Sequence, residues 1–245
     1  ISSGFTSKQY KKIIPTLGFL PAGFVYRNKK TNPLLLKLFK NIGSVNSIMY
    51  IESLFEPNLL LSIDRNNKDI AISKYRTFLL MKDFLMDQEL LSSKKVDHIF
   101  IKPWLWKQFP SVSSELLENN PKSYDLIYGK AYKKISLFKG LIILDDISTA
   151  FCECIFLEKP FLVLMDSHYD YTPFARELFW DMEKSGYITF TKNDAYKTIL
   201  NYLSNPIDFK SKQIRKLYQF KKYFCEGEFF NLREFSDFLI NNINN

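Results

Sequence analysis

The stretch from residue 140 to residue 166, GLIILDDISTAFCECIFLEKPFLVLMD, constrains the fold more than any other part of the chain. Its continuous apolar run Leu141–Leu144 is typical of a strand in a parallel sheet that is covered on both faces. After a polar turn, residues 149–157 are apolar nearly all round, which predicts a helix buried on most sides. Lys159 and Pro160 end this helix, and residues 161–165 predict a second buried strand. The stretch therefore predicts a β–α–β unit whose helix begins at the carboxyl end of a strand, the usual ligand-binding edge of open α/β sheets.

Strand-like and helical patterns alternate along most of the chain, which predicts one mostly parallel sheet flanked by helices, an α/β fold, with Ile99, Ile143 and Val163 in strands. Further strands are expected at 47–51, 96–101, 123–128 and 186–190, and further helices at 70–91, 130–137, 174–185 and 194–203, the last capped by Thr191 or Asn193. Two C-terminal helices are expected at 210–223, which is basic, and at 231–242.

The start of the predicted helix at residue 149 favours anion binding. Its free backbone N–H groups and its dipole attract a phosphate, and the hydroxyls of Ser148 and Thr149 add two donors beside Asp146. Glu153 lies four residues after Thr149, on the same face and about one turn deeper. A buried carboxylate needs a partner, which a sugar hydroxyl, a lysine or an arginine would provide. The alternative is that Ser148 only caps the helix and Glu153 pairs within the protein.

The sequence Asp146-x-Ser148-Thr149, a helix carrying Glu153, then Lys-Pro and a strand resembles the C-terminal nucleotide-sugar domain of GT-B glycosyltransferases. More narrowly, it is similar to transferases of bacterial O-antigen and capsule clusters, over roughly residues 48–205. The resemblance implies a Rossmann-like GT-B domain. It also implies that Ser148 and Thr149 hold the donor phosphate and that Glu153 contacts the ribose.

Two other strand ends carry candidate donor-binding residues. Lys102 ends a predicted strand and would face a phosphate or a donor carboxylate, unless it is simply a solvated lysine. Trp104 and Trp106 follow it and would stack on a base or sugar, or fill a gap over the sheet. The second strand end is followed by the loop from Asp166 to Pro173, which leads into a helix that carries Arg176. The resemblance supports donor contacts in this loop. His168 in this loop is a candidate general base, or a loop histidine without a catalytic role.

Lys and Arg exceed Asp and Glu by 34 to 26, a net charge of +8. Such a surplus suits nucleotide phosphates, an anionic membrane surface or nucleic acid. The absence of a dense basic run or RNA-binding motif disfavours nucleic acid. With the basic C-terminal helix, the surplus predicts peripheral, salt-sensitive binding to anionic membranes.

Cysteine and histidine content disfavours disulfides and metal sites. Cys152 and Cys154 fall inside the buried helix, Cys225 is remote from them, and the only histidines are His98 and His168. Cys152 and Cys154 are therefore expected to be small core residues in a reducing compartment. No apolar stretch has the ~18 to 20 residues of a membrane span, and no signal peptide is evident. We therefore expect a cytoplasmic protein, or a peripheral one at the inner face of the bacterial membrane.

The domain plan departs from that of a complete GT-B enzyme, which has two Rossmann-like domains. Only residues 47–205 form a convincing one, followed by C-terminal helices over 206–245. Residues 1–46 are therefore expected to be a linker or a remnant of the acceptor domain, and the start at Ile1 rather than Met fits a fragment.

The resulting hypothesis is a GT-B glycosyltransferase that needs no bound metal or other cofactor. It would transfer a sugar from a nucleotide-activated donor, for which a CMP-activated, Kdo-like acidic sugar is the first guess, to a bacterial surface glycan or lipid-linked glycan. One alternative is a polyol-phosphate transferase of the teichoic-acid type. Another is a non-catalytic nucleotide-binding α/β module.

Overall fold

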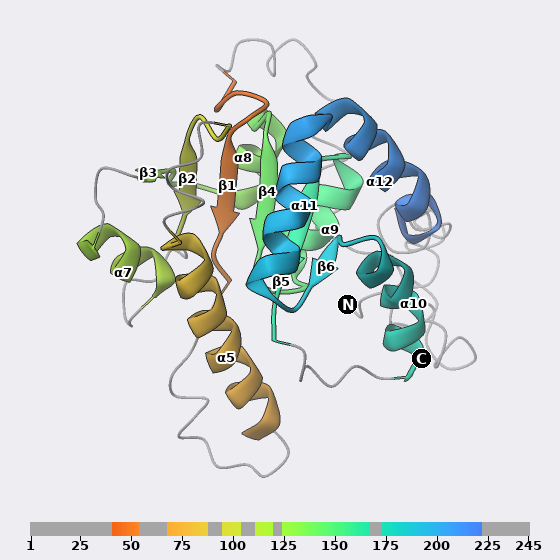
Figure 1. Cartoon of the computed structure of the whole chain (residues 1–245), viewed down its shortest axis with the longest axis horizontal. Helices are drawn as coiled ribbons and strands as arrows, with labels where there is room; N and C mark the ends of the chain where they lie inside the picture. Colours follow the sequence, from red (N-terminus) through yellow and green to blue (C-terminus); the bar gives the residue numbers. More distant parts are fainter. Residues whose placement is uncertain are drawn as a thin grey trace, which may run out of the picture.

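The computed structural model describes residues 41–53, 68–87, 95–103, 111–119, 124–166 and 173–221. They contain a six-stranded sheet in the order β3-β2-β1-β4-β5-β6, and every pairing in it is parallel. The strand arrows point the same way in Figure 1. The strands are β1 Ile48–Ile51, β2 Ile99–Lys102, β3 Tyr124–Leu126, β4 Leu141–Leu144, β5 Phe161–Leu164 and β6 Ile188–Thr189. The fold is therefore α/β and Rossmann-like, as predicted.

Helices cover both faces of the sheet. They are α5 Lys68–Leu85, α7 Val112–Asn119, α8 Ala131–Leu137, α9 Thr149–Phe156, α10 Pro173–Lys184, α11 Lys192–Ser204 and α12 Pro206–Phe220. Helices α5 and α11 lie on one face, and α8 and α9 lie on the other (Figure 1). This two-sided cover explains why β1, β4 and β5 are buried along their whole length.

The central strands form the core in a fixed register. Ile48 of β1 lies between Ile99 of β2 and Leu141 of β4. The predicted strand positions Ile99, Ile143 and Val163 fall in β2, β4 and β5 and are buried. The apolar runs of the sequence therefore correspond to strands shielded from water on both sides.

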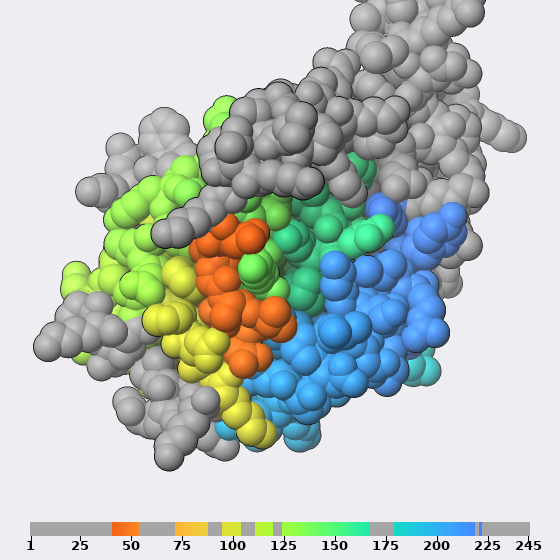
Figure 2. All heavy atoms as spheres, turned by 90° about the horizontal axis from the view of Figure 1, so that it is seen from above, coloured from red at the N-terminus to blue at the C-terminus, as the bar shows by residue number. Residues whose placement is uncertain are grey.

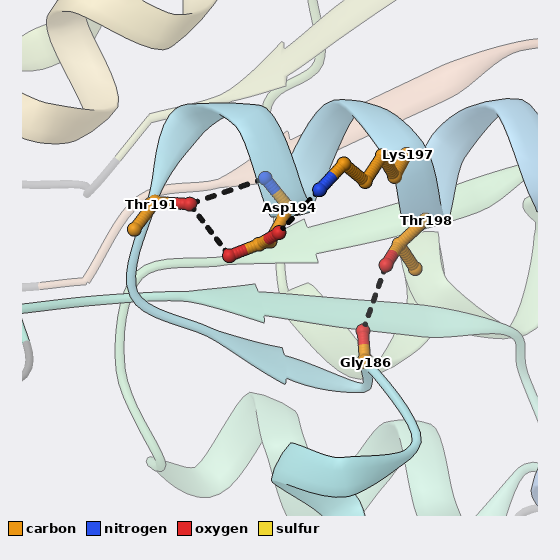
Figure 3. A network of polar contacts seen from close by, with 5 residues as sticks. All are labelled: Gly186, Thr191, Asp194, Lys197 and Thr198. Carbon is orange, nitrogen blue, oxygen red and sulfur yellow. Dashed lines mark hydrogen bonds and ion pairs between the residues drawn. The ribbon is translucent and has the colours of Figure 1, made fainter.

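Helix α11 begins with the N-cap that the sequence offered as one of two choices. The Thr191 hydroxyl accepts a hydrogen bond from the Asp194 N–H at 3.2 Å and donates to Asp194 Oδ2 at 2.8 Å (Figure 3). Lys197 contacts the same carboxylate at 3.1 Å, and further along the helix the Thr198 hydroxyl donates to the Gly186 carbonyl at 3.1 Å. The cap is therefore Thr191 rather than Asn193.

Two predicted helix boundaries were wrong. Helix α5 ends at Leu85 rather than at residue 91. The Asp87 N–H bonds to the Phe84 carbonyl three residues back, which tightens the chain out of the helix. Helix α12 begins at Pro206 rather than at residue 210, because Asn205 accepts from the Asp208 N–H as N-cap and Pro206 occupies the first turn.

Helix α7 was not predicted, although its start follows ordinary capping rules. The Ser111 hydroxyl accepts from the Ser114 N–H at 3.1 Å, and Val112 and Leu116, four residues apart, are both buried. A serine followed by apolar residues at this spacing was the available signal.

The buried side chain of Gln213 joins helix α12 to β5. Gln213 accepts a hydrogen bond from the Phe161 N–H at 3.2 Å and donates to the Phe161 carbonyl at 2.8 Å. The expected helix at 231–242 and the predicted nature of residues 1–40 lie outside the described residues. Within the described part, no helix combines the length and apolar character that crossing a bilayer requires.

Candidate ligand site at the switch point

The order of strands reverses between β1 and β4, which is where ligands bind in open α/β sheets. The two strands are paired so that their last residues, Ile51 and Leu144, are opposite each other. The residues that follow, Glu52 after β1 and Asp145 after β4, therefore leave the sheet side by side. Helix α9 starts from the same edge.

Asp145 is the most strongly anchored carboxylate at this edge. The Tyr50 hydroxyl donates to its Oδ2 at 2.6 Å, and the Ser53 N–H donates to Oδ1 at 3.0 Å. Burial raises the pKa of Asp145 to about 6, and the bonds from Tyr50 and Ser53 oppose that rise. Burial also raises the pKa of Tyr50 well above its ordinary value, and the negative charge of Asp145 is the next largest cause.

Glu52 connects β1 to α7. Its Oε2 accepts from the Ser113 hydroxyl at 2.6 Å, and its Oε1 accepts from the Ser113 N–H at 3.2 Å. Its own N–H donates to the Lys102 carbonyl at 3.1 Å. The side chains of Glu52 and Ser113 are both buried, so the contact between them fixes α7 against the carboxyl edge of the sheet.

Lys102 is buried, not a solvated strand-end lysine. Its side chain is only 4% exposed, and its Nζ donates to the Pro103 carbonyl at 2.9 Å. Burial lowers its pKa, while the charges of Glu52 and Glu153 oppose this. Lys102 therefore serves first as the counter-charge for two carboxylates of the protein.

Glu153 lies on the buried side of α9 with incomplete hydrogen bonding. It is 6% exposed, and its Oε2 has no hydrogen-bond partner among the described residues. Burial raises its pKa to about 7, against the opposing charge of Lys102. A buried acceptor left unpaired costs free energy, so this oxygen would be stabilised by a hydroxyl or N–H donor from a ligand.

The N-terminus of α9 presents donors that the helix does not use. Ser148 is the N-cap residue, yet its side chain makes no capping hydrogen bond, and Thr149 is exposed. The first N–H groups of any α-helix lack intrahelical acceptors. The alternative that Ser148 serves only as a side-chain cap does not hold in this structure.

Asp146 lies beside this helix start, and the negative charge of its carboxylate is partly compensated. Lys74 Nζ of α5 is 4.0 Å from its Oδ2. Burial is the main cause of the raised pKa of Asp146, and Lys74 and a backbone hydrogen bond from Ile147 act in the opposite direction.

The second predicted contact region is described only in part. Asp166 follows β5 and donates its N–H to Thr77 Oγ1 of α5 at 2.9 Å. Arg176 lies in α10, where only the backbone is described. His168, Trp104 and Trp106 lie outside the described residues.

Carboxylates dominate this edge. The edge carries the carboxylates of Glu52, Asp145, Asp146 and Glu153, and the ammonium groups of Lys74 and Lys102 compensate part of their negative charge. In the described part of the chain, no three Asp, Glu, His or Cys side chains gather as metal ligands would. The helix start is therefore the part of the edge best suited to an anion, and the carboxylates are suited to hydroxyl and amine donors.

Comparisons of the chain with protein-family models, with curated proteins and with solved structures found no match. The strand order is nevertheless that of dinucleotide-binding α/β folds. Such an order specifies where a ligand binds and leaves its identity to the residues of the site.

Sequence reasoning brought together Lys102, Asp146, Ser148, Thr149 and Glu153 at one edge, where the structure also places them. It missed Tyr50, Glu52, Ser113 and Asp145 as parts of the same network. The available signal was a carboxylate directly after a buried strand, which both Glu52 and Asp145 satisfy.

Proposed function

We propose that this chain binds a nucleotide-activated sugar at the β1/β4 switch point and transfers the sugar to a glycan acceptor. The supporting observation is that a helix N-terminus able to bind an anion and a carboxylate able to accept a hydrogen bond lie close together. Among the described residues, the Ser148 side chain does not cap the α9 N-terminus, and one turn deeper no group donates a hydrogen bond to Glu153 Oε2. A nucleotide offers both partners, a phosphate for the helix start and a sugar hydroxyl for the carboxylate.

The sequence after β1 argues against a dinucleotide cofactor, the other ligand class with this strand order. Dinucleotide-binding folds use a glycine-rich turn after the first strand and an acidic residue near the end of the second. Here residues 52–67 contain no glycine, and β2 ends in Lys102. The phosphate site is therefore expected at the β4–α9 turn instead.

The transfer chemistry follows from the charges at this edge. When the sugar leaves, negative charge develops on the nucleotide phosphate, and the α9 dipole with the Ser148 and Thr149 hydroxyls would stabilise it. Glu153, balanced by Lys102, would hold the nucleoside through a hydroxyl. The resemblance of the Asp146-x-Ser148-Thr149 motif to GT-B glycosyltransferases supports glycosyl transfer over other uses of a nucleotide.

The test is calorimetric titration of the protein with CMP, UDP and GDP, followed by a donor-hydrolysis assay with sugars activated by whichever nucleotide binds. A CMP-activated acidic sugar is the first donor to try, because the net charge of +8 also suits a sugar carboxylate. Binding followed by release of free nucleotide supports the proposal. Binding without turnover of any sugar or polyol donor would instead indicate a non-catalytic module, and no nucleotide binding would refute the site.

Glu153→Gln separates the two halves of the site. The substitution removes the charged acceptor but leaves the helix start intact, so affinity for inorganic phosphate should be unchanged while nucleotide affinity falls. A parallel loss for both ligands would mean that Glu153 supports the helix start rather than the nucleoside.

A further inference from the structure

A second candidate site lies at the opposite, amino edge of the sheet. A cavity of about 540 Å³ is lined there by residues that lie two or three positions before a strand, among them Phe138 and Lys139 before β4 and Lys159 before β5. Figure 2 shows this edge, where the segment 41–53 (orange) and the C-terminal helices (blue) come together. The Tyr202 hydroxyl joins the two segments by donating to the Val45 carbonyl at 2.7 Å. The volume is in the usual range for small-molecule sites.

Three lysines from three separate segments line this cavity: Lys139 after α8, Lys159 after α9 and Lys210 on α12. Lys159 is held in place by the way α9 ends. The Lys159 N–H bonds to the Cys154 carbonyl and the Glu158 N–H to the Ile155 carbonyl, with Glu158 at a positive φ of 53°. These are the two bonds of a Schellman motif. Lys159 Nζ then donates to the Phe138 carbonyl at 2.7 Å, which points the ammonium group into the amino edge.

Among the described residues that line the cavity, none balances the positive charge of this lysine cluster. No carboxylate is among the described residues that line the cavity. The nearby acidic residues are engaged elsewhere, Asp208 with Lys212 at 2.7 Å and Glu158 with Lys221 at 2.7 Å. Burial and then the charge of Lys210 lower the pKa of Lys159 to about 8. A bound anion would relieve both the repulsion and the burial penalty.

Most of the other residues that line the cavity are apolar. Phe138 and Ile214 line the cavity, and at its rim Ile207 is 84% exposed. A lone exposed isoleucine is unremarkable, but here it borders a cavity with cationic groups. The combination favours a ligand that carries a compact anion on an apolar body.

We propose that the cavity formed by Lys139, Lys159 and Lys210 binds a phosphate monoester that carries an apolar chain. A phosphate monoester brings about 1.5 to 2 negative charges near neutral pH, which matches a three-lysine cluster better than a single carboxylate does. The ligand is either a soluble alkyl phosphate or a lipid with a terminal phosphate headgroup. Because this cavity lies at the amino edge of the sheet and the N-terminus of α9 lies at the carboxyl edge, it is separate from the proposed nucleotide site.

The test is calorimetric titration of the full chain with hexyl phosphate and with inorganic phosphate. Lys210→Gln removes an exposed lysine of the cluster, and the matched control Lys212→Gln removes an exposed lysine on the same helix that lies outside the cavity and pairs with Asp208. Hexyl phosphate should bind saturably and more tightly than inorganic phosphate. Its affinity should fall about tenfold in Lys210→Gln and stay unchanged in Lys212→Gln.

Flotation with phosphatidylcholine vesicles, with and without phosphatidic acid, identifies the source of the phosphate. Binding that requires phosphatidic acid and is lost in Lys210→Gln but kept in Lys212→Gln assigns the site to a lipid headgroup. Hexyl phosphate binding without vesicle binding assigns it to a soluble phosphate monoester. The proposal is overturned if hexyl phosphate does not saturate, if inorganic phosphate binds equally well, or if the two lysine variants behave alike.

Discussion

The Tyr50 hydroxyl donates a 2.6 Å hydrogen bond to Asp145 Oδ2 and so connects the ends of β1 and β4, the two strands between which the strand order reverses. Tyr50 is fully buried, and its bond to a carboxylate is of the stronger, charge-assisted kind. The same carboxylate accepts from the Ser53 N–H, so it also directs the chain that leaves β1. The Tyr50–Asp145 pair therefore holds the two strand ends of the candidate site together.

Tyr50→Phe should destabilise the protein mainly above pH 6. The pKa of Asp145 in the folded protein, about 6, already lies above its ordinary value of 3.8. The ionisation of Asp145 therefore lowers the stability of the folded state as the pH rises from 3.8 to about 6. Without the hydroxyl the folded pKa rises further, and the extra loss, about 1.5–3 kcal/mol, appears only where Asp145 is ionised. Urea unfolding at pH 5 and pH 8 measures this. Tyr128→Phe, at a tyrosine that is 59% exposed, is the control, and an equal loss at both pH values would contradict the account.

Glu153→Gln should flatten the dependence of stability on pH. The folded pKa of Glu153, about 7, exceeds its ordinary value of 4.5, so the folded state binds more protons than the unfolded state between these values and stability falls as the pH rises. At pH 8 the removed penalty is on the order of 3 kcal/mol, and the loss of the Glu153 charge beside Lys102 offsets part of it. Unfolding free energies measured from pH 4.5 to pH 8 for both proteins test this, and parallel curves would show that Glu153 is not the group responsible.

The fold was predictable where a segment's own chemistry decided its structure. The runs around Ile143 and Val163 are so apolar that only a doubly covered strand suits them, and α9 between them has a single charged residue. The end of α5 at Leu85 was not predictable, because the apolar pattern continues and only a local i→i−3 bond stops the helix.

The candidate site was predictable in position but not in its internal pairing. Residues at the ends of neighbouring parallel strands must meet at one edge, which is why Lys102 and Ser148 were grouped correctly. That Glu52 bonds to Ser113, however, depends on how α7 packs 61 residues away in sequence. The burial of Lys102 is also a product of tertiary packing, so from the sequence a strand-end lysine looked equally suited to solvent.

Thr191→Ala should lower stability by about 1 kcal/mol, because it removes the side-chain acceptor for the Asp194 N–H at the start of α11. Asn193→Ala is the matched control, since it was the other cap candidate and lies two residues further along the same turn. Thermal unfolding of the two variants should show a lower midpoint for Thr191→Ala than for Asn193→Ala. Similar midpoints would mean that the cap in Figure 3 contributes little.

The central claim, that a nucleotide phosphate binds at the N-terminus of α9, is tested most directly by calorimetric titration of Thr149→Val with the nucleotide that the wild-type protein binds. Valine keeps the shape of threonine and removes the hydroxyl, and a lost hydrogen bond to a charged group weakens binding by about tenfold or more. Thr198→Val is the control, because it removes a hydroxyl that bonds to Gly186 near β6 instead of at the switch point. The account predicts at least a tenfold loss of affinity for Thr149→Val and wild-type affinity for Thr198→Val; wild-type affinity in both variants would contradict it.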